Sequence, residues 1–146
     1  MAKPFTPEAR EKLYEAYQDV RDDKSETRWC VAGYPDNGKL IDITATGVDY
    51  QEFLELMQDD ERIYGFVRYE TGDEMSKRAK FAFITWIGPA VSSLQRARVS
   101  TDKAFIKDIF TNFGVEVLAD DRHDLQEDGV KDRLVKAGGA NYGTGR

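Results

Sequence analysis

Hydrophobic residues recur along this chain with two different periods, which predicts a fold built from both helices and strands. Near the start, Thr6-Pro7 is typical of a helix beginning, and the apolar residues that follow are spaced as on one face of a helix. That stripe consists of Ala9, Leu13, Ala16, Tyr17 and Val20. We therefore expect an amphipathic first helix that ends near residues 21–23.

Two hairpins are predicted next, with a short helix between them. Residues 27–34 and 39–44 are strand-like, and the turn signal Asp36-Asn37-Gly38 joins them. Asp49 and Glu52 have capping-box spacing at the start of the stripe Tyr50, Phe53, Leu54 and Met57. Residues 63–69 and 81–87 predict a second hairpin with a loop over 70–79 at its tip. Residues 81–87 are almost all apolar, which is typical of a strand covered on both faces.

The last third of the chain predicts two helices around one strand. From Leu94 to Phe113 the pattern is helical, with weaker helix formers at Val99-Ser100, so we expect a long third helix that could bend there. Residues 115–118 predict a short strand. Asp124 and Glu127 have capping-box spacing before a fourth helix, which we expect to end at Lys136-Ala137-Gly138.

This order of elements, α-β-β-α-β-β-α-β-α, predicts an α/β (α+β) fold with a central mixed sheet and helices on its faces. With 146 residues and 40% hydrophobic content the chain can form one core, and we expect a domain over 1–137 and a flexible glycine-rich tail over 138–146. No apolar stretch approaches a membrane span, no signal peptide is recognisable, and Cys30 has no second cysteine to pair with. We therefore expect a cytoplasmic protein.

Charge is distributed unevenly in this acidic chain, whose net charge is −6. Between residues 75 and 107 there are seven basic residues and only Asp102, a net charge of +6, whereas the rest of the chain carries −12. The basic residues are Lys77, Arg78, Lys80, Arg96, Arg98, Lys103 and Lys107. Such a patch predicts a binding surface for a negatively charged partner, although a solvated face is the simpler alternative.

Residues suited to catalysis are few. The only histidine, His123, lies in a polar turn, and Cys30 lies on an apolar strand where a small core residue is expected. We find no zinc-type Cys/His spacing, no calcium loop and no glycine-rich phosphate motif, so we expect no enzyme, metal or cofactor. Four aromatic residues could form a base-stacking surface, but their apolar neighbours favour core packing. They are Trp29, Phe81, Phe83 and Trp86.

Motifs spread over nearly the whole chain carry a family resemblance. They are Arg21-Asp22-Asp23, Gly72-Asp73, Met75-Ser76-Lys77-Arg78 with Lys80-Phe81, Ile84-Thr85-Trp86-Ile87-Gly88, Leu94-Gln95-Arg96-Ala97, Thr101-Asp102-Lys103 and Lys136-Ala137-Gly138-Gly139-Ala140-Asn141-Tyr142. Together they resemble the coactosins, within the actin-depolymerising-factor homology (ADF-H, cofilin) family. The blocks at 76–81 and 136–142 are specific.

This resemblance implies a mixed sheet flanked by four helices, and binding to the sides of actin filaments (F-actin) without strong monomer binding. It implies that Lys80 is the main actin contact and Lys77 a supporting one. Coactosins are also associated with countering filament capping, and a mammalian member binds a leukotriene-pathway lipoxygenase through the lysine aligned with Lys136. A monomer associated with the cytoskeleton is expected.

The basic patch and the resemblance combine into one hypothesis, in which the cations contact one actin subunit or two neighbours. The hairpin would supply Lys77, Arg78 and Lys80, and the long helix would supply Arg96, Arg98 and Lys103. A dominant contact is expected to be the least exposed of the set.

The third helix starts with fewer lysines than in severing cofilins and no serine precedes Ser25, so severing and amino-terminal phospho-control are not expected. The alternative is a phosphoinositide or other polyanion-binding module; nucleic acid is disfavoured by the acidic composition.

Overall fold

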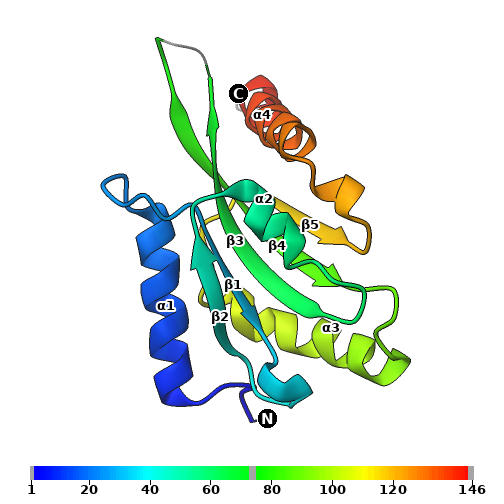
Figure 1. Cartoon of the computed structure of the whole chain (residues 1–146). Coiled ribbons are helices and arrows are strands. Elements are labelled where there is room, and N and C mark those ends of the chain that lie inside the picture. Colours follow the sequence, from blue (N-terminus) through cyan, green and yellow to red (C-terminus); the bar gives the residue numbers. More distant parts are fainter. Residues whose placement is uncertain (1, 73–74, 145–146) are drawn as a thin grey trace.

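The computed structural model describes residues 2–72 and 75–144, with the side chains described as far as Gly138. Figure 1 shows a twisted sheet with helices on both faces. The elements, in order, are α1 (Pro7–Arg21), β1 (Trp29–Gly33), η1 (Pro35–Asn37), β2 (Asp42–Gly47), α2 (Tyr50–Glu55), β3 (Arg62–Thr71), β4 (Arg78–Ile87), α3 (Ser93–Lys107), β5 (Val115–Ala119), η2 (Arg122–Leu125) and α4 (Glu127–Thr144).

The sheet has five strands in the order β2-β1-β3-β4-β5. β1 pairs antiparallel with β2 and β3, β3 pairs antiparallel with β4, and β4 pairs parallel with β5. The fold class, the order of the elements and the mixed sheet are therefore confirmed.

Each face of the sheet carries its own hydrophobic core, because side chains of a strand alternate between the two faces. On one face, Leu13 of α1 and Ile106 of α3 pack with Phe83 of β4. On the other face, Phe53 of α2 and Leu134 of α4 belong to the same cluster as Ile84 and Trp86. β4 lies inside the sheet and is buried on both faces from Ala82 to Ile87, as predicted from its continuous apolar run.

Both predicted caps at the first two helices form. The hydroxyl of Thr6 accepts a hydrogen bond from the backbone N–H of Ala9 at 3.1 Å. Asp49 caps α2 by accepting from the backbone N–H of Gln51 at 3.0 Å. These bonds satisfy N–H groups that have no partner inside the helix, so the sequence marks both starts reliably.

The predicted third helix was wrong in length and in its buried face. α3 is one helix that stops at Lys107, and the chain then turns so that Phe110 is buried outside any helix. The face toward the sheet is Val99, Asp102 and Ile106, whereas Leu94 is 80% exposed. A buried acid on the core face and an exposed leucine together shift the apparent apolar stripe.

Two further boundaries differ from the predictions. β2 begins at Asp42 instead of residue 39, because the turn after β1 is a short 3₁₀ helix and the chain then reaches Ile41, whose N–H donates to the carbonyl of Pro4 at 2.7 Å. α4 begins at Glu127 after a 3₁₀ turn capped by Asp121, and it continues through residue 138 to Thr144.

The predicted mobility of the tail remains a prediction, and its last two residues lie outside the described part of the chain. Among the helices that the structure describes, none is long and apolar enough to cross a membrane.

Candidate functional site

Three of the predicted site residues lie on the β3–β4 hairpin, and two of them lie inside a strand. β4 begins at Arg78, so Arg78 and Lys80 pair in register with Thr71 and Tyr69 of β3. Lys77 directly precedes the strand. The predicted loop as far as residue 79 was therefore wrong. A hairpin that projects beyond the core (Figure 1) forms its ladder from polar residues, which leave no apolar pattern in the sequence.

Lys80 differs from the two other hairpin cations in its surroundings. Strand alternation places it on the same face of β4 as Ile84, which packs in the core beneath α4. The Lys80 side chain is half-buried and its Nζ lies against Gly138 of α4, whereas Lys77 and Arg78 are exposed. Among the three predicted hairpin cations, Lys80 is thus the one whose charge lies closest to the body of the domain.

Two arginines that the predicted basic patch did not include lie on the opposite face of the same strand. The guanidinium of Arg21 lies 5.0 Å from the ring centroid of Phe81, and that of Arg68 lies 5.7 Å from it. Arg68 also donates to the carbonyl of Val20 at 3.2 Å and pairs with Asp23. The base of the hairpin therefore carries cations on both faces. Arg21 comes from α1 and Arg68 from β3, so the two arginines are too far apart in the sequence to be grouped with Lys80 by a local pattern.

On α3, the predicted cations divide into two kinds. Arg96 and Arg98 are exposed. Lys103 instead pairs with Glu116 of β5 at 3.2 Å, and Lys107 pairs with the same carboxylate at 2.7 Å. Burial raises the pKa of Glu116, but the hydrogen bonds from Lys107 and Lys103 outweigh it and hold this pKa below its ordinary value. The positive charge of Lys103 is therefore already partly neutralised by Glu116.

The two exposed arginines of α3 lie far from the hairpin tip. Arg96 lines a hollow of about 380 Å³ together with Ile87, the last residue of β4, and Leu118. Arg78 is the first residue of the same ten-residue strand, and ten residues of strand span roughly 30 Å. The structure therefore separates the predicted cations into a hairpin group, an α3 group and a pair held by Glu116.

Asp102, the only acidic residue between residues 75 and 107, does not lie on the surface. Asp102 is 5% exposed, and its carboxylate accepts a hydrogen bond from the Tyr34 hydroxyl at 2.7 Å. The same hydroxyl lies 2.6 Å from that of Tyr64. The sequence held a signal for this burial, because Val99, Asp102 and Ile106 are spaced as one helix face. The surface formed by residues 75–107 is therefore more basic than the composition of this segment indicates.

Lys136 projects from α4 away from the hairpin. Its side chain is 76% exposed and pairs with Asp132 at 3.0 Å along the same helix. Two residues correspond to roughly 200° around a helix, so Lys136 and Gly138 lie on opposite sides of α4. The structure does not bring Lys136 together with Lys80.

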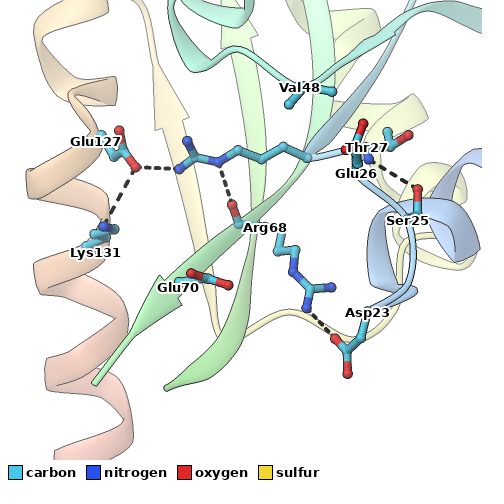
Figure 2. A pocket seen from close by; sticks show the side chains of 10 residues that line it. Asp23, Ser25, Glu26, Thr27, Val48, Arg68, Glu70, Glu127 and Lys131 are labelled. Atoms are coloured by element: carbon cyan, nitrogen blue, oxygen red, sulfur yellow. Dashed lines mark hydrogen bonds and ion pairs between the residues drawn. The ribbon is translucent and has the colours of Figure 1, made fainter. Parts of the chain in front are cut away.

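A cleft of about 330 Å³ lies between the start of β1 and α4 (Figure 2). Most of its charged side chains are bonded to one another: Arg28 pairs with Glu127 at 2.6 Å, and Lys131 lies 3.7 Å from the same carboxylate. Arg68 and Asp23 form a further pair at its edge. These contacts connect the sheet to α4, and we regard the cleft as a structural connection.

Groups suited to catalysis do not converge in the described part of the chain. Cys30 is fully buried, and burial raises the pKa of its thiol, so it stays protonated as a core residue. His123 is exposed in η2, where its backbone N–H donates to Asp121. Within residues 2–72 and 75–144, no three acidic, histidine or cysteine residues are grouped so as to hold a metal ion. Trp29, Trp86 and Phe83 are buried, which confirms that they are core residues.

Comparisons with known proteins agree with this architecture. The family model for the cofilin/tropomyosin-type actin-binding protein matches residues 8–135. The chain is 48% identical to the human coactosin-like protein (Homo sapiens) over 133 residues, which cover 91% of this chain and 92% of that protein. It is 37% identical to coactosin of Dictyostelium discoideum over 135 residues, 90% of each.

Solved structures give the same result. A crystal structure of human coactosin-like protein matches with a TM-score of 0.84 at 44% identity, covering 92% of this chain and 99% of that one. The solution structure of mouse coactosin, described as an actin filament binding protein, matches with a TM-score of 0.79 at 46% identity, covering 97% and 96%. This chain belongs to the cofilin/tropomyosin-type actin-binding family and resembles coactosins over nearly its whole length.

Proposed function

We propose that this protein binds the sides of actin filaments, with Lys80 of the β3–β4 hairpin as the main contact and Lys77 and Arg78 as supporting ones. Family membership supports actin as the partner, and the description of the similar mouse protein supports the filament form. The observation that carries the proposal is the half-buried position of Lys80 beside the exposed Lys77 and Arg78. A partly desolvated, restrained cation contributes more to binding than a mobile one at the rim of an interface.

Arg96 and Arg98 form a second contact surface in this proposal. They lie roughly one strand length from the hairpin tip, so one small acidic patch cannot engage both groups. Two contacts on neighbouring subunits exist only in a filament, which accounts for a preference for filaments over monomers. Lys103 belongs to the same set, but its pairing with Glu116 makes it a minor contributor.

Co-sedimentation with filaments tests this assignment. The Lys80→Ala variant is expected to bind roughly tenfold more weakly or worse, because hot-spot residues at the centre of an interface carry most of its energy. Arg98→Ala is expected to weaken binding less, and Lys103→Ala least. Lys12→Ala is the matched control, since Lys12 is an exposed lysine on α1 and its removal changes the net charge equally. Full binding by a folded Lys80→Ala variant would contradict the proposal.

We propose further that the protein decorates filaments and counters their capping without severing them. Filaments imaged with the protein are expected to keep their length distribution, and barbed-end growth in the presence of capping protein is expected to be restored. Shortening of isolated filaments would contradict this part of the proposal and leave side binding intact.

A phosphoinositide or other polyanion-binding role is the alternative for the same surface. Met75 is 93% exposed two residues before Lys77, and an apolar residue beside cations suits a lipid surface. Vesicles containing phosphatidylinositol bisphosphate are expected to compete with filaments for the hairpin. Vesicle binding without any filament binding would favour the alternative.

Lys136 is proposed as a second site for a protein partner of the lipoxygenase type. Its exposed pairing with Asp132 contributes little to stability, so the lysine is available at small cost. Lys136→Ala is expected to abolish that interaction in a pull-down and to leave filament binding unchanged.

We propose that the protein acts as a monomer at the cytoplasmic actin cytoskeleton.

A further inference from the structure

Lys80 occupies space that a side chain at position 138 would fill. A Cβ atom added to Gly138 would lie 2.6 Å from the Lys80 Nζ and 3.9 Å from its Cε. The first distance is shorter than real Cβ contacts allow, so a residue other than glycine at this position would displace the ammonium group. The absence of a side chain at Gly138 thus leaves a notch in α4 that the end of Lys80 occupies.

Backbone conformation does not explain the glycine at this position. Gly138 lies inside α4, and the glycine with a positive φ in the described part of the chain is Gly72. Glycine is a poor residue for a helix interior, so a helix alone would favour alanine. Gly129 of the same helix has nothing within 4 Å of the corresponding Cβ position, which makes the close approach a particular feature of position 138.

We infer that Gly138 is a positioning residue for filament binding, which acts by holding the ammonium group of Lys80 in one place between the hairpin and α4. This inference rests on the proposed role of Lys80. A lysine side chain loses much rotamer freedom when a partner fixes it. The notch restricts this freedom before binding, which lowers the cost of association. An acidic group of the partner therefore meets Lys80 beside α4.

Gly138→Ala tests the inference, with Gly129→Ala as the matched control. Nζ is the far end of a flexible side chain, so the added methyl group moves the ammonium and leaves the fold intact. Filament affinity is expected to fall about threefold to tenfold in Gly138→Ala, the range for releasing one restrained side chain. Gly129→Ala is expected to bind like the unchanged protein. Thermal unfolding of both variants should occur at or above the original temperature, because alanine favours helix.

Lys80 can also be followed without actin. In limited acetylation read by mass spectrometry, Lys80 is expected to react more slowly than exposed Lys77 in the unchanged protein and in Gly129→Ala. In Gly138→Ala the two lysines are expected to react at similar rates. Equally slow acetylation of Lys80 in all three proteins would contradict the inference that Gly138 positions its ammonium group.

A double-mutant cycle separates this inference from the proposed function. At low salt, where weakened binding stays measurable, Gly138→Ala added to Lys80→Ala is expected to have no further effect, because it acts through Lys80. Additive losses would show that position 138 acts independently of Lys80. If Lys80→Ala weakens binding and Gly138→Ala does not, only the inference fails. If Lys80→Ala binds normally, the proposed site fails and the inference fails with it.

Discussion

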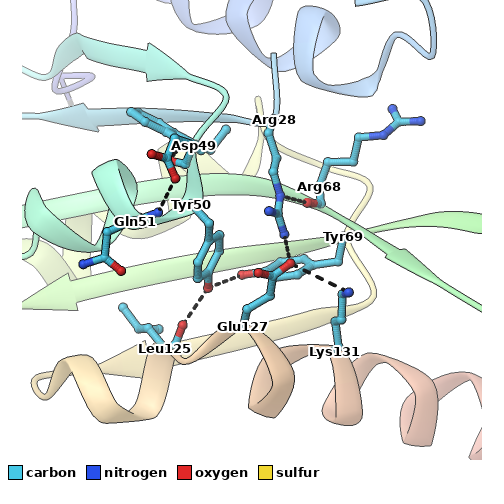
Figure 3. Close-up of polar contacts among 10 residues, drawn as sticks. Arg28, Asp49, Tyr50, Gln51, Arg68, Tyr69, Leu125, Glu127 and Lys131 are labelled. Atoms are coloured by element: carbon cyan, nitrogen blue, oxygen red, sulfur yellow. Dashed lines mark hydrogen bonds and ion pairs between the residues drawn. The ribbon is translucent and has the colours of Figure 1, made fainter. Parts of the chain in front are cut away.

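Arg28 is the residue whose replacement most directly tests how α4 is held against the sheet. Figure 3 shows its guanidinium between β3 and α4. One nitrogen donates to Glu127 at 2.6 Å, and Nε donates to the backbone carbonyl of Arg68 at 3.0 Å. The group also lies 4.8 Å from the ring centroid of Tyr50 and 5.5 Å from that of Tyr69. Arg28→Met removes these polar contacts while it keeps an apolar chain of similar length.

The expected loss follows from the partial exposure of the pair. The side chains of Arg28 and Glu127 are 23% and 36% exposed, so their ion pair contributes about 1 kcal/mol, at the upper end for surface pairs. The hydrogen bond to the carbonyl of Arg68 adds about 1 kcal/mol. The ring contacts add roughly 0.5–1 kcal/mol. We therefore expect Arg28→Met to lower the free energy of unfolding by about 2.5–3 kcal/mol.

Urea unfolding followed by tryptophan fluorescence measures this loss, because Trp29 and Trp86 are buried in the core that α4 covers. Lys131→Met is the matched control: Lys131 contacts the same Glu127 carboxylate, but at 3.7 Å along the helix. Its removal is expected to cost only about 0.3–0.5 kcal/mol. The reasoning is refuted if Arg28→Met costs no more than Lys131→Met.

Two further predictions concern buried and paired polar groups. Tyr34→Phe removes the hydrogen bond to buried Asp102 and leaves the carboxylate without that donor, so the free energy of unfolding is expected to fall by about 1–3 kcal/mol; an unchanged urea midpoint would show that another donor replaces it. The folded-state pKa of Glu116 lies below its ordinary value of 4.5, so its stabilising contribution is present above that pH and is lost as the pH falls through the folded pKa. The stability difference between the unchanged protein and Glu116→Gln should therefore shrink from pH 7 to pH 3, and a constant difference would contradict the assigned ion pairs.

Element type and order were predictable because each depends on local chemistry. Thr6 and Asp49 satisfy free N–H groups at helix starts, and the continuous apolar run of β4 suits a strand that is covered on both faces. Family membership was also predictable, since the motifs at 76–81 and 136–142 are local strings of residues. Several boundaries failed, and those at the start of β4 and the end of α3 depend on pairing and burial beyond the local pattern.

The candidate site was only partly predictable. The sequence identified Lys77, Arg78 and Lys80 as neighbours, and they lie together on one hairpin. It also grouped Lys103 and Arg96 with them by charge alone. Nearness in sequence does not fix nearness in space, because the ten residues of β4 lead the chain roughly 30 Å away before α3 begins.

The sequence by itself determined the class of fold, the family and the existence of a basic segment, because periodicity, caps and charge are properties of neighbouring residues. Only the tertiary structure decided which charges remain available. It buries Asp102 against Tyr34, pairs Lys103 with Glu116, and sets Lys80 into the notch at Gly138. Each of these contacts joins elements distant in sequence, and burial and pairing, which set how strongly a charge can act on a partner, arise only when those elements pack together.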